Sequence, residues 1–104
     1  MNFNMDAIAT DMLSAIKETL SGNWSKVEPI AKQFVHGRKN RLELLAESYI
    51  KGEITLQKLE SRLEDEKTIL EAELEALKVL SKAPAQKAAN MAFDILTKAI
   101  KAAL

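Results

Sequence analysis

The 104-residue sequence contains no cysteine, one histidine, three glycines and two prolines. Without cysteine the chain has no disulfide, no thiolate metal site and no cysteine nucleophile, so a disulfide-stapled secreted fold is excluded. All-β proteins need a turn roughly every 8–12 residues, and so few glycines and prolines disfavour that class. No stretch approaches the roughly 20 apolar residues that span a bilayer. We therefore expect a cytoplasmic protein.

The sequence also lacks an excess of either charge, because 15 Lys and Arg balance 15 Asp and Glu. A neutral chain has no overall attraction for nucleic acid or for anionic lipid. The hydrophobic fraction of 47% is too high for a disordered chain. The length suits one domain, so we expect residues 1–104 to form a single helical-bundle domain.

Apolar residues recur at helical spacing through most of the chain, and Ala, Leu, Glu and Lys, all strong helix formers, dominate it. The pattern predicts helices over residues 6–20, 24–51, 56–82 and 85–103. In the second helix the apolar stripe consists of Trp24, Val27, Ala31, Phe34, Val35, Leu42, Leu45 and Tyr49. In the third helix it consists of Leu56, Leu59, Leu63, Leu70, Leu74 and Leu77.

Short polar residues and glycines mark the expected helix ends. Asn4 or Asp6 is suited to cap the first helix, and Gly22 is expected to end it in the left-handed conformation. The start of the second helix stays open between a cap at Asn23 and a capping box that begins at Ser25. Pro29 must then lie near the first turn, because deeper in the helix it removes a hydrogen bond.

The later boundaries have clearer signals. Gly52 is expected to end the second helix, and Thr55 is expected to cap the third. Pro84 predicts a break before the fourth helix, because the residue before a proline avoids helical dihedrals. The short connection over residues 51–55 favours antiparallel neighbours. The expected fold is all-α, with four helices: a long antiparallel hairpin of the second and third helices, flanked by a shorter N-terminal and a shorter C-terminal helix.

Charged residues interrupt the stripes of the expected hairpin. If the hairpin turns near Glu53, facing residues have numbers that total about 107. This register puts Arg38 and Arg41 opposite Glu66 and predicts an ion pair between Glu66 and one of the two arginines. Such a pair fixes register more than it adds stability, because desolvation offsets much of the attraction. The alternative is that these side chains extend into solvent.

The third helix is apolar on more than one side only in its second half. We therefore expect residues 42–63 to form a thin, charged arm that projects from the body. The fourth helix is apolar around most of its circumference, so it is either sandwiched in the bundle or buried in an oligomer. A homodimer is the expected state, since twofold dimers are the commonest oligomers. The candidate contacts between chains are Leu44, Ile50, Ile69, Leu80, Met91 and Ile95.

The sequence contains no recognisable catalytic, cofactor-binding or metal-binding motif. His36 is the only histidine, and no serine stands in a nucleophile setting. The acidic residues lack the Glu-x-x-His pairs of four-helix di-iron proteins. The basic cluster over residues 36–41 is best explained as the complement of the acidic third helix. Nucleic acid is a disfavoured partner, because no aromatic residues are interleaved with that cluster.

These features favour a non-enzymatic helical interaction or assembly module, with a second copy or another protein as its partner and no cofactor. The alternative is a protein that lies on a membrane surface through its fourth helix, where three lysines flank a wide apolar face. Much of that face is alanine, which partitions weakly into lipid. A bundle that binds a small molecule is a third interpretation, and no group of polar residues supports it.

Overall fold

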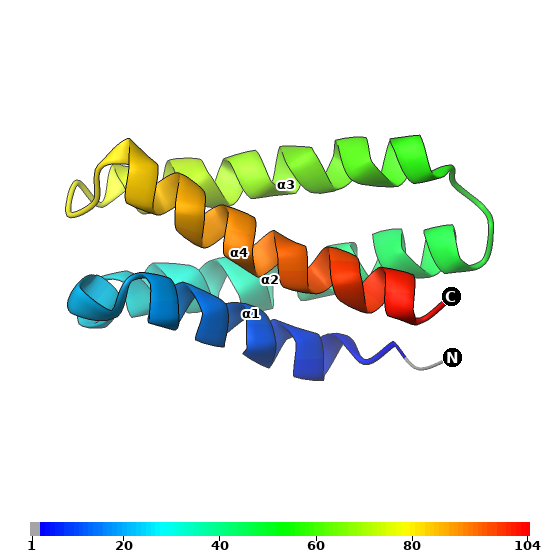
Figure 1. The fold of residues 1–104 in the computed structure, drawn as a ribbon, viewed down its shortest axis with the longest axis horizontal. Helices are drawn as coiled ribbons and strands as arrows, with labels where there is room; N and C mark the ends of the chain where they lie inside the picture. The colour runs from blue at the N-terminus through cyan, green and yellow to red at the C-terminus, as the bar shows by residue number, and fades with distance from the viewer. Residues whose placement is uncertain (1–2) are drawn as a thin grey trace.

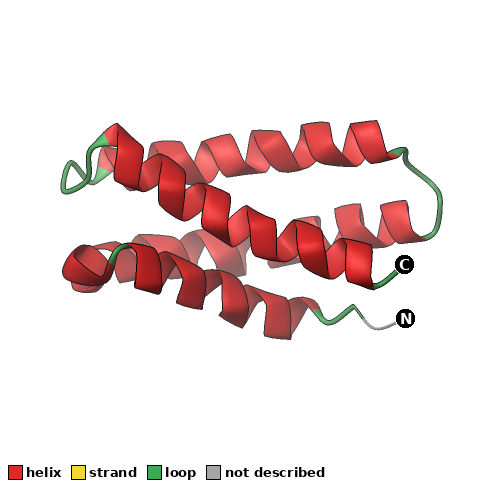
Figure 2. Ribbon diagram, in the orientation of Figure 1, coloured by secondary structure: helices red, strands yellow, loops and turns green. Residues whose placement is uncertain are grey.

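The computed structural model of the chain describes residues 3–104, which form four α-helices, one 3-10 helix and no strand. The all-α class expected from the sequence is confirmed, as Figure 2 shows. The elements are α1 (Met5–Thr19), η1 (Ser21–Asn23), α2 (Trp24–Ile50), α3 (Leu56–Ala76) and α4 (Lys82–Ala102).

The helices lie lengthwise in a molecule that measures 40 × 23 × 19 Å along its principal axes. At about 1.5 Å per residue, the 27 residues of α2 alone account for the longest of these dimensions. The connection between α2 and α3 lies at one end of the molecule, where both termini also lie, and the connections around residues 20–23 and 77–81 lie at the other (Figure 1). In that view α1 and α4 are in front of α2.

The connection from α2 to α3 has the residues that such a turn requires. Gly52 has a φ of 78°, which a residue without Cβ adopts at little cost. The amide of Glu53 donates to the carbonyl oxygen of Ser48 at 2.8 Å, as in a Schellman motif. The hydroxyl oxygen of Thr55 then accepts a hydrogen bond from the amide of Lys58 at 3.1 Å and caps α3. Both boundaries agree with the sequence prediction.

The connection from α1 to α2 differs from the prediction. The Asn4 side chain caps α1 as one of the two predicted alternatives, but Gly22 is not in the left-handed region. The 3-10 helix η1 occupies this position, and the amide of Asn23 donates to the carbonyl oxygen of Leu20 at 2.8 Å. That turn leads directly into α2, whose N-cap Asn23 makes no side-chain cap hydrogen bond. Pro29 lies in the second turn of α2.

The connection from α3 to α4 shows a larger difference. The third helix ends at Ala76 rather than at residue 82, and Lys78 follows in the left-handed region with a φ of 59°. The fourth helix begins at Lys82, so Pro84 lies inside its first turn and does not precede it. A proline is tolerated there, because the first amides of a helix have no intrahelical acceptor.

The hydrophobic core extends along the whole molecule, and the predicted arm over residues 42–63 is wrong. Leu42, Leu59 and Leu63 are at most 5% exposed. The C-terminal half of α4 covers this end, where Leu96 and Ile100 are fully buried (Figure 1). The physical reason is that α4 runs back toward the α2–α3 connection, which places Asp94 and Thr97 beside Leu63 of α3 (Figure 1).

The fourth helix packs against both α1 and α3. Its buried side chains are Ala85, Ala88, Ala89, Ala92, Phe93, Leu96 and Ile100. Leu56 is the exception to the predicted stripe of α3, because it stands at the first position of the helix and is 41% exposed. Among the helices of residues 3–104, none has the length and hydrophobicity needed to cross a membrane.

Candidate functional site

Glu66 is the one charged side chain that is buried in the described part of the chain, with an exposed fraction of 4%. Helix α3 places it on the same face as Leu63 and Leu70, which are both in the core. Its Oε2 accepts a hydrogen bond of 2.6 Å from Nη1 of Arg38, and its Oε1 lies 2.9 Å from Nε of Arg41. The structure thus brings together all three residues of the predicted ion pair.

The two arginines are held differently. The Arg38 guanidinium lies over the ring of Phe34, 5.5 Å from its centroid, and its side chain is 32% exposed. Phe34 in turn meets Phe93 of α4 edge to face, with the ring centroids 6.3 Å apart. The Arg41 side chain is 69% exposed, and Nε is the nitrogen that contacts Glu66. A buried carboxylate therefore contacts an arginine whose side chain is mostly exposed.

A hollow of about 460 Å³ opens beside this cluster, between α2 and α3. We call it the Gly37 hollow. Its lining residues are Gln33, Phe34, Gly37, Arg38, Arg41 and Glu73. Gly37 has no positive φ, and a Cβ added to it would meet nothing within 4 Å. Neither backbone conformation nor packing within the described chain therefore requires glycine at this position.

The predicted contacts between chains divide into two groups. Leu44 on α2 and Met91 on α4 are exposed, at 65% and 44%. The other four, Ile50, Ile69, Leu80 and Ile95, are partly buried and pack against the core of the same chain. Of these six residues, only Leu44 and Met91 are thus exposed enough for a partner to contact much of the side chain.

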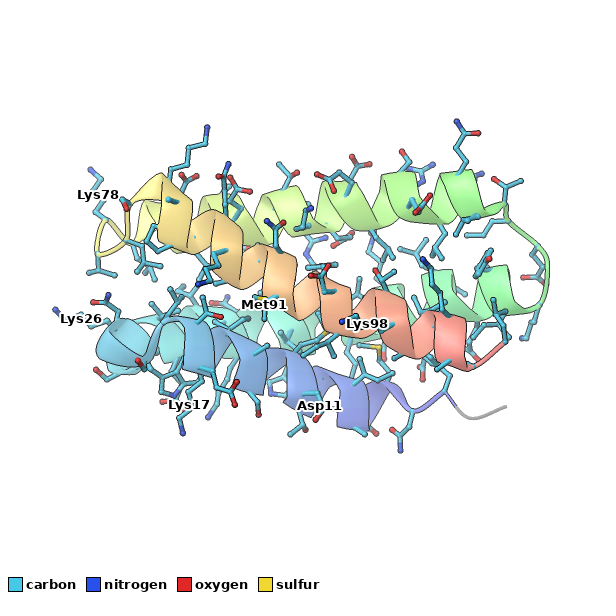
Figure 3. The ribbon with its side chains drawn as sticks, in the orientation of Figure 1. Asp11, Lys17, Lys26, Lys78, Met91 and Lys98 are labelled. Atoms are coloured by element: carbon cyan, nitrogen blue, oxygen red, sulfur yellow. The ribbon has the colours of Figure 1, made fainter. Side chains whose placement is uncertain are left out.

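Met91 borders a second hollow, of about 330 Å³, between α1 and α4. We call it the Met91 hollow. It is lined by Asp11, Ser14, Ala15, Glu18, Met91 and Ile95. Figure 3 shows Met91 on α4 and Asp11 on α1, on the side of the molecule that these two helices form. The lining of this hollow is mainly apolar, and its two acidic side chains, Asp11 and Glu18, both belong to α1.

His36 lies on a different face of α2, in a hollow between α1 and α2 that Ser14 and Glu28 also line. No hydrogen bond joins His36 to either residue within residues 3–104, and Glu28 instead pairs with Lys32 at 3.0 Å. A nucleophile and its base must be within hydrogen-bond reach, so this trio lacks the geometry of a catalytic triad. No group of three or more metal-ligating side chains is found among the described residues.

One surface ion pair connects α2 to α1. Nζ of Lys39 donates to Oδ1 of Asp6 at 2.6 Å. This hydrogen bond, together with the negative charge of Asp6, raises the pKa of Lys39 above its ordinary value. The Asp6 side chain is 78% exposed, so water and salt screen this pair far more than the contacts of Glu66.

No family model, no curated protein and no solved structure matches the chain. The largest of these hollows is lined by three residues that were not predicted from the sequence as candidates: Gln33, Gly37 and Glu73. One signal was available. A glycine in the middle of a long helix costs about 1 kcal/mol relative to alanine, so it needs a reason.

Proposed function

We propose that this chain is a non-enzymatic helical interaction module that assembles with a second copy of itself. The observation that carries the proposal is that Leu44 and Met91, two of its predicted interface residues, stay exposed, and that Met91 also lines a hollow between α1 and α4. Leu44 stands one turn beyond Arg41, which lines the Gly37 hollow. A scattered exposed leucine is ordinary, but an apolar side chain next to a shaped and charged hollow suits a partner surface.

The antiparallel hairpin of α2 and α3 is the scaffold of this proposal. Arg41 and Glu66 are opposite each other in the expected register, and their 2.9 Å contact supports that alignment. The contact of Arg38 with the same carboxylate supports it again, less than one turn away. In this arrangement Glu66 fixes the position of the arginines, and the arginines fix the surface that a partner meets.

A membrane-surface function through α4 is the alternative, and it requires a larger rearrangement. The apolar side chains that would enter the lipid headgroup region include Phe93, Leu96 and Ile100, which are at most 4% exposed. Helix α4 would have to leave the bundle before it could bind lipid. Binding to anionic vesicles with loss of the α4 core contacts would favour this alternative over assembly.

The experiment is the molar mass in solution, measured by sedimentation equilibrium over a wide range of concentrations. We expect a reversible monomer–dimer equilibrium. Met91→Glu and Leu44→Glu place a charge on each exposed apolar side chain in turn, and Ala72→Glu, at an exposed position of α3, is the matched control. A wild-type chain that stays monomeric at every concentration contradicts the proposal.

A further inference from the structure

We infer that the outer face of α2 is the surface on which two copies of this chain pack, with their α2 helices crossing antiparallel at Gly37 about a twofold axis. The inference rests on the proposed function and goes further, because it names the face, the crossing point and the pairing of charges. Four features of the described residues carry it: the unexplained glycine, an apolar stripe, a hollow with charges of both signs and a prepositioned arginine.

The first feature is Gly37 itself. It lies in the middle of a 27-residue helix, is exposed, and has free space where a Cβ would be. An alanine there would favour the helix by about 1 kcal/mol, so the glycine weakens the isolated chain without relieving any contact inside it. A helix of another molecule that crosses at this position gains from the missing side chain, because the two backbones can approach closely.

The second feature is a stripe at a spacing of seven residues. Ile30, Gly37 and Leu44 are two helical turns apart and share one face of α2. Leu44 is 65% exposed, and Ile30 is half-buried without being part of the hydrophobic core. In an antiparallel crossing centred on Gly37, Leu44 of each copy faces Ile30 of the other. Both side chains then lose water contact symmetrically.

The third feature is the charge pattern of the Gly37 hollow, which is complementary to itself. Arg41 lies four residues after Gly37, and Gln33 lies four residues before it at the other end of the hollow, which Glu73 also lines. About a twofold axis at Gly37, Arg41 of each copy reaches the Gln33 position of the other and meets Glu73 there. Within residues 3–104 Glu73 takes part in no ion pair.

The fourth feature is that Arg41 is held in place before any partner binds. Its Nε contacts Glu66 at 2.9 Å, while its side chain stays 69% exposed. A guanidinium that is already positioned loses less side-chain entropy when it binds a carboxylate. A twofold interface needs one surface patch that matches itself, and a patch with one exposed cation, one carboxylate and a central gap satisfies that condition. The Met91 hollow has only acidic charges on its α1 wall and does not.

The steric test uses Gly37→Leu. The free space around Gly37 means that leucine should not disturb the monomer, so its thermal midpoint should be equal to or higher than that of the wild type. The bulky side chain should raise the dimer dissociation constant at least about tenfold, because it occupies the crossing point. Ala72→Leu, which adds the same side chain at an exposed position of α3, is the matched control and should leave the dimer unchanged.

The electrostatic test uses Glu73→Arg, which would face Arg41 of the partner. It should also raise the dissociation constant at least about tenfold, since like charges then meet. Glu71→Arg makes the same change two residues away, outside the hollow, and should have little effect. Glu73→Gln should be intermediate. All variants are measured by sedimentation equilibrium, with circular dichroism as the check that each is folded.

The outcomes separate the two proposals. Loss of the dimer in Gly37→Leu and Glu73→Arg, with the two control variants dimeric, supports the inference. A wild-type dimer that survives both variants and dissociates in Met91→Glu overturns the inference and leaves the proposed function standing on the α1–α4 face. A wild-type monomer at all concentrations overturns both.

Discussion

The inner and outer faces of α2 differ in how completely other residues of the same chain cover them. On the inner face Val27, Phe34 and Leu42 are at most 2% exposed. On the outer face Gly37 leaves a gap and Leu44 remains in water. The inner face therefore stabilises the monomer, whereas the outer face has an exposed leucine and a gap that no described residue fills.

Two carboxylates of α3 differ in the same way, one being paired inside the chain and the other open to solvent. Glu66 is buried at the seam of α2 and α3, and both of its carboxylate oxygens contact arginines. Glu73, seven residues later on the same helix, lines an open hollow and belongs to no ion pair in the described chain. A carboxylate that is buried needs its partners inside the molecule, while one at the surface is available to another molecule.

The largest expected difference between the faces concerns packing. Phe34→Ala should destabilise the monomer by about 3–5 kcal/mol, because it removes a buried ring that contacts both Phe93 and Arg38. Leu44→Ala should change it by less than about 0.5 kcal/mol. Urea unfolding at low protein concentration, where association contributes least, measures both. Equal losses would contradict the division into two faces.

Removing the two arginines and removing Glu66 should have unequal effects on the free energy of unfolding. Replacing Arg38 and Arg41 together by Met should cost about 3 kcal/mol, because it leaves the Glu66 charge buried without a partner. Glu66→Leu should change stability by less than about 1 kcal/mol, since the two arginines are partly exposed and can turn to solvent. Unfolding midpoints in urea test this. If Glu66→Leu also leaves the α2–α3 pairing unaltered, the ion pair does not set the register.

Replacing Gly37 and replacing Gly52 by alanine should have opposite effects on stability. Gly37→Ala should stabilise the monomer by about 1 kcal/mol, because it improves helix propensity in open space. Gly52→Ala should destabilise it by about 1 kcal/mol, because the φ of 78° is unfavourable for a residue with Cβ. The midpoints of thermal unfolding of both variants, measured at low protein concentration, test these two expectations. A loss of stability in Gly37→Ala would show that the monomer does use this glycine.

The smallest effect is expected at the exposed edge of α2, where Lys39 contacts Asp6. Because the pKa of Lys39 is raised in the folded chain, its contribution is complete below the ordinary lysine pKa of about 10.4 and is lost as the pH rises through the folded value. Asp6→Asn should therefore be less stable than the wild type at neutral pH, and in strong alkali the difference should shrink to what Asp6 contributes at the N-terminus of α1. A pH-independent difference between the two would contradict this assignment.

The sequence predicted structure best where the periodic pattern and the turn residues agreed. The all-α class, the cap by Thr55 and the end of α2 before Gly52 followed from residue types with one strong preference each. The end of α3 and the start of α4 were not predicted correctly. Lys78 takes the left-handed conformation that is usual for glycine, and Pro84 is accommodated in the first turn of α4.

The candidate site was predictable in part. The register argument named Arg38, Arg41 and Glu66, since charges inside an apolar stripe need partners across the seam. It did not identify Glu73 or the hollow, because the depth of a surface between two helices depends on how their side chains pack. Burial of Leu42, Leu59 and Leu63 was also missed, since it depends on where α4 ends in space.

The most direct test of the α2 crossing uses the absence of cysteine from the chain. Gly37→Cys and Met91→Cys each introduce a single thiol, one at the proposed axis and one on the opposite candidate face. A disulfide forms readily only when the two Cα atoms are within about 7 Å, which residues on a twofold axis at a helix crossing approach. Mild oxidation should convert Gly37→Cys to a covalent dimer and leave Met91→Cys monomeric. A covalent dimer from Met91→Cys alone would contradict the account.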